Sequence, residues 1–198
     1  TSITELSDEM TEVLKEGGVN RLSVGIQTFD DTGRKLLGRR GSGDAAIERL
    51  KKTREAGFEN LNIDLIYNWP GETLETLQKD LDIIKSLELA GISFYSLMLH
   101  EKTPLYDRIS ETDREKMGQT RWDKTQFDLI LKELGKVGYK PFELTKLIRD
   151  DLDRYDYIRI RHSGGSCIAI GHGAGGTQPQ QALAGVVIHL LRQSRVAE

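Results

Sequence analysis

The sequence contains a single cysteine, Cys167, among 198 residues. One thiol can form no internal disulfide and cannot by itself hold a thiolate metal site, so stability has to come from burial. No stretch approaches the roughly 20 apolar residues of a membrane span, and the first residues lack the basic and apolar parts of a signal peptide. Basic and acidic residues number 28 and 31 without a block of either sign, which gives nucleic acid and anionic membranes no electrostatic footprint. We therefore expect a cytoplasmic protein with small or uncharged partners, and neither nucleic acid nor membrane binding.

Apolar periodicity divides most of the chain into alternating helices and strands. Helical spacing predicts helices over residues 6–15, 30–37 and 44–56, from residue 74, and over 127–137. Short apolar runs predict strands over residues 21–26, 61–67, 92–97 and 139–145. Further on, we expect a strand at 159–162, glycine-rich loops, and an apolar helical tail over 182–191.

Strands separated by helices of ten or more residues imply right-handed crossovers and a parallel sheet. This α/β pattern fits an open doubly wound sheet or a barrel, and residue spacing does not choose between them. A complete α/β barrel typically needs about 250 residues, which is more than the chain has. The sequence also starts without a methionine, so we expect an excised part of a larger fold, with one domain to about residue 145.

Polar residues near the carboxyl ends of the predicted strands are the first candidates for a site, because ligands of parallel sheets bind there. Gln27 follows the first strand, Asp64 interrupts the second, and Ser96 closes the third, with Met98 and His100 beyond it. A buried carboxylate is costly without a partner, so Asp64 is expected either to bind a ligand or to pair with a backbone N–H or a neighbouring arginine. Arg39 could hold a carboxylate bidentately over the strand ends, or be solvated.

Two weaker patterns lie near the end of the chain. The glycines of residues 171–176 could let backbone N–H groups approach a phosphate, but no Lys-Ser/Thr follows, and a plain turn explains them better. His162, Cys167 and His172 are evenly spaced, yet structural zinc sites need four ligands and usually tighter pairs.

Six segments follow recognisable patterns: residues 18–29 are similar to GVxRxSxGxQSF, residues 36–39 to LGR, 54–58 to AREAGF, 62–73 to NxDLIYGLPGQT, and residues 93–97 and 103–106 to SxYxL and GTPLY. In these segments the chain resembles the oxygen-independent coproporphyrinogen III oxidase-like radical S-adenosylmethionine family. These blocks keep the family's order and spacing across residues 18–106. Looser similarities follow at 142–145 and at 170–174.

The resemblance implies part of a (β/α)₆-type barrel that binds S-adenosylmethionine beside a [4Fe–4S] cluster. By position, Gln27, Arg39, Asp64 and Met98 match residues with which the family contacts this cofactor. It further implies a porphyrin or heme substrate and an electron donor such as flavodoxin. Residues 1–106 would then be the later part of the barrel, 107–176 the family's C-terminal region, and 177–198 an appended tail that resembles nothing in the family.

The chain also departs from the family. The CxxxCxxC motif that holds the cluster is absent, and Cys167 cannot replace it. Asn68 and Trp69 replace a usual Gly-Leu pair, and Lys102 replaces a glycine. Residues 154–162 do not match the HNxxYW stretch of the heme-chaperone branch, whereas residues 173–176 resemble the anaerobic heme-degrading branch.

These observations favour a radical S-adenosylmethionine enzyme of tetrapyrrole metabolism, of which this fragment supplies part of the cofactor-binding wall and is inactive alone. Oxygen-independent coproporphyrinogen III oxidation and anaerobic heme degradation are the expected reactions. A heme-binding chaperone of the same fold without turnover is the alternative. An unrelated aldolase-like barrel is disfavoured, because no Schiff-base lysine stands at a strand end.

Overall fold

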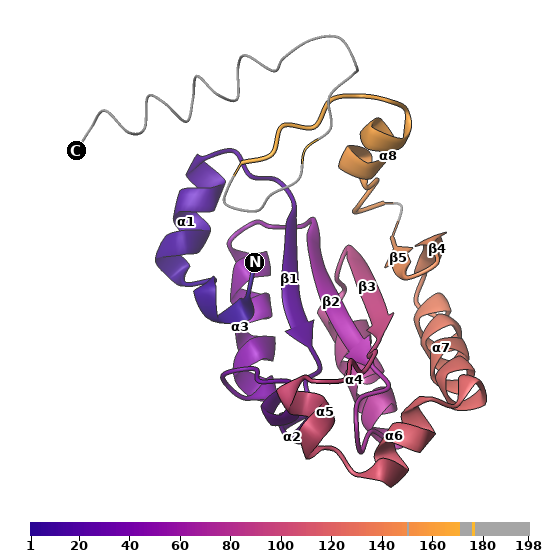
Figure 1. Cartoon of the computed structure of the whole chain (residues 1–198). Helices are drawn as coiled ribbons and strands as arrows, with labels where there is room; N and C mark the ends of the chain where they lie inside the picture. The colour runs from indigo at the N-terminus through magenta and orange to yellow at the C-terminus, as the bar shows by residue number, and fades with distance from the viewer. Residues whose placement is uncertain (150, 171–175, 177–198) are drawn as a thin grey trace. The chain divides into compact units, whose positions relative to one another are not determined.

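In a computed structural model of the chain, residues 1–149, 151–170 and 176 are described. They belong to two compact units, one spanning Thr1–Arg154 and the other beginning at Tyr155. The sheet and most of the helices lie in the first unit (Figure 1). The predicted tail at 182–191 and most of the glycine-rich run lie outside the described residues.

The first unit alternates strands and helices in the predicted order. Its strands are β1 (Leu22–Gln27), β2 (Leu61–Tyr67), β3 (Gly91–Ser96), β4 (Lys140–Glu143) and β5 (Lys146–Ile148). Its helices are the 3-10 turn η1 (Ile3–Glu5), α1 (Asp8–Glu16), α2 (Asp31–Leu36), α3 (Gly43–Glu55), α4 (Leu74–Leu87), α5 (Pro104–Arg108), α6 (Glu111–Met117) and α7 (Thr120–Gly135).

Short polar side chains fix the starts of six of these helices. Each accepts a hydrogen bond from a backbone N–H three residues further on, which satisfies a donor that the helix itself leaves unpaired. The capping residues are Ser7, Asp30, Ser42, Thr73, Thr103 and Ser110.

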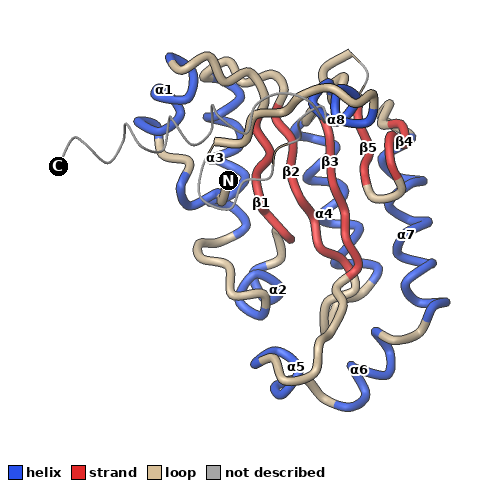
Figure 2. Tube along the Cα trace, turned by 45° about the horizontal axis from the view of Figure 1, so that its top comes forward, coloured by secondary structure: helices blue, strands red, loops and turns tan. Residues whose placement is uncertain are grey.

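The strands form one sheet in the order β1-β2-β3-β5-β4 (Figure 2). β1, β2 and β3 are parallel, as predicted, because α2–α3 and α4 carry the chain back between them. The predicted fourth strand over 139–145 is instead a hairpin, since β5 turns back along β4 and pairs antiparallel with both β4 and β3. The result is a mixed sheet in an α/β fold, with the three parallel strands β1, β2 and β3 on one side and the antiparallel hairpin β4–β5 at the other edge.

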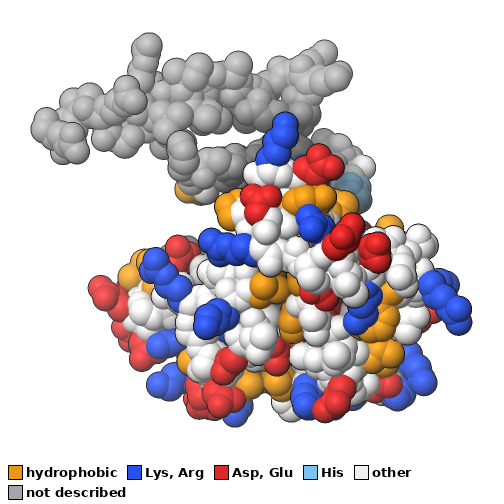
Figure 3. All heavy atoms as spheres, turned by 60° about the horizontal axis from the view of Figure 1, so that its bottom comes forward, with side chains coloured by type: hydrophobic (Ala, Val, Ile, Leu, Met, Phe, Trp, Pro, Cys, Tyr) orange, Lys and Arg blue, Asp and Glu red, His pale blue; other side chains and the backbone are white. Residues whose placement is uncertain are grey.

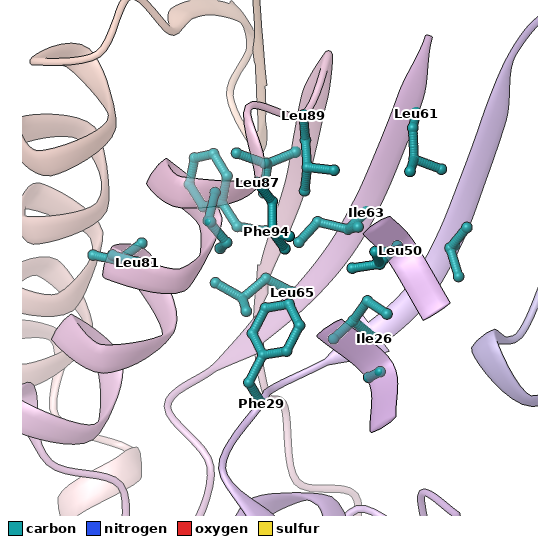
Figure 4. Packing of buried hydrophobic residues seen from close by; sticks show 14 of the residues in the cluster. Ile26, Phe29, Leu50, Leu61, Ile63, Leu65, Leu81, Leu87, Leu89 and Phe94 are labelled. Carbon is teal, nitrogen blue, oxygen red and sulfur yellow. The ribbon is translucent and has the colours of Figure 1, made fainter. Parts of the chain in front are cut away.

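One face of the parallel strands carries the core. Alternate residues of β1, β2 and β3 point to this face, where α3 and α4 cover them (Figures 1 and 4). Close packing of these aliphatic and aromatic side chains supplies most of the apolar burial of the unit. The central members are Val24, Ile26, Leu50, Ile63, Leu65, Leu77, Leu81, Ile84, Ile92 and Phe94.

The second unit corrects one prediction. Residues 159–162 are not a strand but the last part of α8 (Asp156–His162). The alternation of isoleucine and arginine there imitates a strand's period of two, yet no neighbouring strand pairs with it among the described residues. Across the described part of the chain, no helix combines the length and the apolar character that a bilayer crossing requires.

Candidate functional site

The face of the sheet opposite α3 and α4 is polar and partly open. Ser23, Asp64 and Tyr95 point to this face from β1, β2 and β3, and Tyr95 is 47% exposed. Gly25, Asp64 and Ser93 lie in register across the three strands. Asp64 is the middle residue of β2, and this face leads toward the carboxyl ends of the parallel strands, beyond which an α/β fold places ligands.

Gln27 ends β1 in a strained conformation. Its φ is +75°, in the left-handed region that residues with a Cβ rarely adopt, and the β1–β2 register shifts between Gly25 and Gln27. The side chain is buried although it is polar. A non-glycine residue held at positive φ costs on the order of 1–3 kcal/mol and is found disproportionately at functional sites.

The carboxylate of Asp64 has few hydrogen-bonding partners in the described structure. Ser23 Oγ donates to Asp64 Oδ1 at 3.4 Å, which is a long hydrogen bond. Neither a backbone N–H nor an arginine pairs with the carboxylate within the described structure, so the structural alternative expected for Asp64 is not observed. The side chain is only half-buried, which lowers the cost of its charge and leaves acceptor capacity for a ligand.

Arg39 lies in the exposed loop between α2 and α3. No ion pair within the described residues involves its guanidinium, so the group keeps its donors. Its backbone N–H donates to Arg34 O at 2.7 Å. The loop that carries it is therefore tied to α2, directly after the end of β1.

Two buried charged residues that were not among the candidates hold the turn after Gln27. Asp80 of α4 accepts hydrogen bonds from Thr28 Oγ1 at 2.7 Å and from the Phe29 N–H at 3.0 Å. Burial raises the pKa of Asp80 to about 6. Arg34 of α2 is 2% exposed and donates only to backbone carbonyls. The only sequence signal for Asp80 was the presence of an aspartate on an otherwise apolar stripe of a helix. Arg34 had no such signal.

A cavity of about 640 Å³ lies beyond the ends of β2 and β3. Met98 lines it and is 74% exposed. Other lining residues are Asn68, Ser96, Leu97, Tyr106, Arg114, Met117 and Asp123. No hydrogen bond in the described structure links Met98 to Gln27, Arg39 or Asp64, and Met98 shares with them only the carboxyl-end side of the sheet. Figure 3 shows acidic and basic side chains interspersed on the surface near this edge, without a large patch of one sign.

The substituted pair Asn68–Trp69 has a structural basis. Asn68 has φ +60°, a conformation that suits the family's glycine and that asparagine tolerates. Its Nδ2 donates to Ser96 Oγ at 3.1 Å and to Met117 O at 3.0 Å. Trp69 is buried, with its ring beside Gly33 of α2.

Glu72 closes the turn that follows β2. Its Oε2 accepts hydrogen bonds from the Asn68 N–H at 2.5 Å and from Gln126 Nε2 at 2.6 Å, while Oε1 has no partner in the described structure. The residue is 1% exposed, and burial raises the pKa of its carboxyl to about 8. The buried Glu72 carboxyl group thus links α7 to the end of β2 by hydrogen bonds.

Lys146 of β5 is a further buried charged residue that sequence patterns did not indicate. Its Nζ lies 3.3 Å from Asn62 Oδ1 and 3.2 Å from Ser93 Oγ, on the polar side of the sheet. Burial lowers the pKa of Lys146 to about 8. It contributes positive charge to the same face as Asp64.

Metal ligands are scarce in the chain. The sequence holds one cysteine, and the described residues contain no cluster of three or more His, Cys, Asp or Glu side chains that could bind a metal. His162 and Cys167 therefore form no metal site with other described residues, and His172 lies outside them. A cluster that needs three thiolates cannot be held by this chain alone.

Comparison with known proteins supports the sequence motifs. Residues 1–84 match the Radical SAM superfamily, whose members use S-adenosylmethionine and a [4Fe–4S] cluster. Over 146 residues, the chain is 34% identical to the heme chaperone HemW of Lactococcus lactis subsp. lactis (strain IL1403), covering 71% of this chain and 37% of that protein. The heme chaperone HemW of Bacillus subtilis (strain 168) is 30% identical over 75% of this chain and 39% of its own length.

A third relative is the anaerobilin synthase of Escherichia coli O157:H7, which is 26% identical over 85% of this chain and 38% of that protein. The chain thus spans about two fifths of the length of these relatives. The solved structure of coproporphyrinogen III oxidase (HemN) from Escherichia coli, a radical SAM enzyme, has a similar fold, with a TM-score of 0.72 at 21% identity over 89% of this chain and 43% of that one. The partial α/β barrel expected from the sequence is confirmed, and the chain belongs to the coproporphyrinogen III oxidase-like group of the radical SAM superfamily.

Proposed function

We propose that this chain forms one wall of the S-adenosylmethionine site in a radical SAM enzyme of tetrapyrrole metabolism. The observation that carries the proposal is the strained Gln27 at the end of β1, next to the strand that presents the under-paired carboxylate of Asp64. By the motif resemblance, both residues match positions with which the family contacts the cofactor.

The residues present fit S-adenosylmethionine. Asp64 has free acceptor capacity for ribose hydroxyls, and Arg39 has free donors for the methionyl carboxylate. Gln27 offers a donor and an acceptor, and the exposed Met98 offers an apolar contact. The chemistry that this cofactor supplies, when bound beside a reduced cluster, is the generation of a 5′-deoxyadenosyl radical. The cluster does not fit here, because its three thiolates would have to come from another part of the protein.

The chain's own residues contribute orientation and charge. Arg39 and Asp64 would fix the two ends of the cofactor, and a preorganised contact at each end is what holds a reacting group in place. We propose a porphyrin or heme as substrate, an electron donor such as flavodoxin as partner, and the cytoplasm as location. Coproporphyrinogen III oxidation and anaerobic heme degradation are the candidate reactions, and names among the relatives support both.

Isothermal calorimetry tests the proposal, with S-adenosylmethionine titrated into the full-length, cluster-reconstituted protein that contains this chain. Asp64→Asn keeps the shape but removes the charge, and Arg39→Gln removes the bidentate donor. We expect each to weaken binding by roughly tenfold, equivalent to one charged hydrogen-bonded contact. Asp82→Asn on the exposed side of α4 is the matched control and should bind as the wild type does. Equal affinities for all four proteins, or no binding by the wild type, would contradict the proposed site.

A heme-transfer protein without turnover is the second candidate, favoured by the two relatives named heme chaperones. The full-length protein that contains this chain, reconstituted with its cluster, separates the two. Release of 5′-deoxyadenosine with substrate turnover supports the enzyme and excludes the chaperone. Stable heme binding without that release supports the chaperone and excludes the enzyme.

A further inference from the structure

Arg34 is a buried cation that has no carboxylate partner at hydrogen-bond distance among the described residues. It lies on α2, a helix of six residues, and its side chain is 2% exposed. Burial lowers the pKa of its guanidinium, so the position is costly for a charged group. Backbone carbonyls alone satisfy the group, and they come from two separate segments of chain.

The first segment is the strained end of β1. Arg34 Nη1 donates to Ile26 O at 3.2 Å and to Thr28 O at 3.0 Å. These are the carbonyls of the residues on either side of Gln27, whose φ is +75°. A single nitrogen bound to both flanking peptides opposes relaxation of Gln27 to an extended strand conformation. Asp80 binds Thr28 and Phe29 from the opposite element, α4, and restrains the same turn.

The second segment is the loop that carries Arg39. Arg34 Nε donates to Gly41 O at 2.9 Å, and Nη2 donates to Arg40 O at 2.8 Å. The Arg34 carbonyl accepts from the Arg39 N–H at 2.7 Å. The loop is thus bound to α2 by its backbone, while the Arg39 side chain stays exposed.

We infer that Arg34 is a positioning residue that joins Gln27 and Arg39 into one preorganised unit of the cofactor site. The planar guanidinium suits this task, because its fixed fork of donors spans two pairs of carbonyls that a point-like ammonium cannot. Preorganisation matters for binding, since each loop or side chain that must be ordered on association weakens affinity. The cofactor part of this inference rests on the proposed function, whereas the structural coupling of the two segments does not.

Amide hydrogen exchange on the 198-residue chain tests the coupling without any ligand. In Arg34→Gln, we expect the Arg39 and Phe29 amides to exchange at least roughly tenfold faster. The four hydrogen bonds from the Arg34 guanidinium to backbone carbonyls are lost in this variant, so local opening costs less free energy. The Leu50 amide in α3 should keep its protection. A folded Arg34→Gln variant with unchanged exchange at Arg39 and Phe29 would overturn the inference.

Two further variants guard against a general loss of structure. Arg34→Lys keeps the charge but should hold only one of the two segments, so exchange should accelerate in one of them. Arg54→Gln is the matched control, since Arg54 Nη1 also binds a backbone carbonyl, Leu87 O at 2.8 Å, at the other end of the sheet. It should leave both amides unchanged. If Arg34→Gln and Arg34→Lys both fail to fold, Arg34 serves the whole core and the positioning role is refuted.

S-adenosylmethionine titration then tests the link to the site. We expect Arg34→Gln to weaken binding by roughly tenfold in the wild-type background and by clearly less in the Arg39→Gln background, because both changes disable the same contact. Arg54→Gln should show no such coupling to Arg39→Gln. Full additivity of Arg34→Gln and Arg39→Gln would overturn the positioning role. Absence of any binding by the wild type would instead overturn the proposed function, while hydrogen exchange still decides whether Arg34 couples the segments.

Discussion

At the scale of single residues, the site region concentrates groups that are costly to fold. Gln27 and Asn68 hold left-handed backbone at the ends of β1 and β2, and Glu72 and Asp80 are buried carboxyls in the helices and turns beside them. Each is held by identifiable contacts: Arg34 around Gln27, and hydrogen bonds to backbone or amide groups around the carboxyls. Strain held in this way keeps strand-end residues in one conformation before any ligand arrives.

Glu72 makes stability depend on pH. Its pKa is raised from 4.5 to about 8 in the folded chain by burial. Between those values the unfolded chain loses a proton that the folded chain keeps, so stability falls as pH rises from about 4.5 to 8 and is level above that. We expect Glu72→Gln, which keeps the shape without the charge, to gain stability relative to the wild type across this window, by about a few kcal/mol at most.

Urea unfolding of both proteins at pH 5 and pH 8.5 measures this difference. The exposed Glu12→Gln change in α1 is the control and should show the same offset from the wild type at both pH values. A Glu72→Gln offset that does not change with pH would mean that the carboxyl is already ionised in the folded chain.

At the scale of elements, α2 is positioned by packing as well as by hydrogen bonds. A Cβ at Gly33 would lie 2.9 Å from Trp69 Cζ2 and 2.9 Å from Thr28 Cγ2. Overpacking of this kind costs about 1–3 kcal/mol, and the better helix propensity of alanine returns at most about 1 kcal/mol. We therefore expect Gly33→Ala to destabilise the chain by about 1–2 kcal/mol in thermal or urea unfolding.

Removing one of the two obstacles should reduce the effect. In a Trp69→Leu background, Gly33→Ala should cost clearly less, because the ring no longer occupies part of the space of the new methyl group, while Thr28 Cγ2 still lies 2.9 Å from it. Gly118→Ala is the control, since a Cβ there has its nearest neighbour at 3.4 Å and φ is −72°. An undiminished cost for Gly33→Ala without Trp69 would show that the Trp69 ring is not its cause and would leave Thr28 Cγ2 as the obstacle.

The elements themselves were largely predictable, and their exceptions have physical reasons. The long helices and the three parallel strands were predicted from the spacing of apolar residues, because an element that is buried on one or both faces needs apolar side chains at regular intervals. β5 was missed because three residues give too short a pattern, and its pairing with β3 is a tertiary contact. The positions of Gln27 and Asp64 were visible as polar residues near strand ends. Arg34 and Lys146 were not, because the sequence around each reads as an ordinary exposed charge.

At the scale of the whole molecule, the sheet has one apolar face, which helices cover, and one polar face, which carries Asp64 and Lys146. The polar face has oxygen and nitrogen atoms that can bind hydroxyl and carboxylate groups, which is what the organic part of the proposed cofactor requires. Iron coordination is a different requirement, because thiolates are needed and the sequence has one. Under the proposed function, the two halves of the cofactor site therefore come from different parts of the protein that contains this chain.

This division predicts the result of anaerobic reconstitution with ferrous iron and sulfide. The 198-residue chain should acquire no [4Fe–4S] cluster, as judged by visible absorption and by electron paramagnetic resonance after reduction, because Cys167 alone cannot replace three thiolates. Cys167→Ser should behave identically. A full-length relative with the three-cysteine motif is the positive control. A cluster bound by this chain, and lost in Cys167→Ser, would show that Cys167 is an iron ligand and that the cofactor site is not divided in this way.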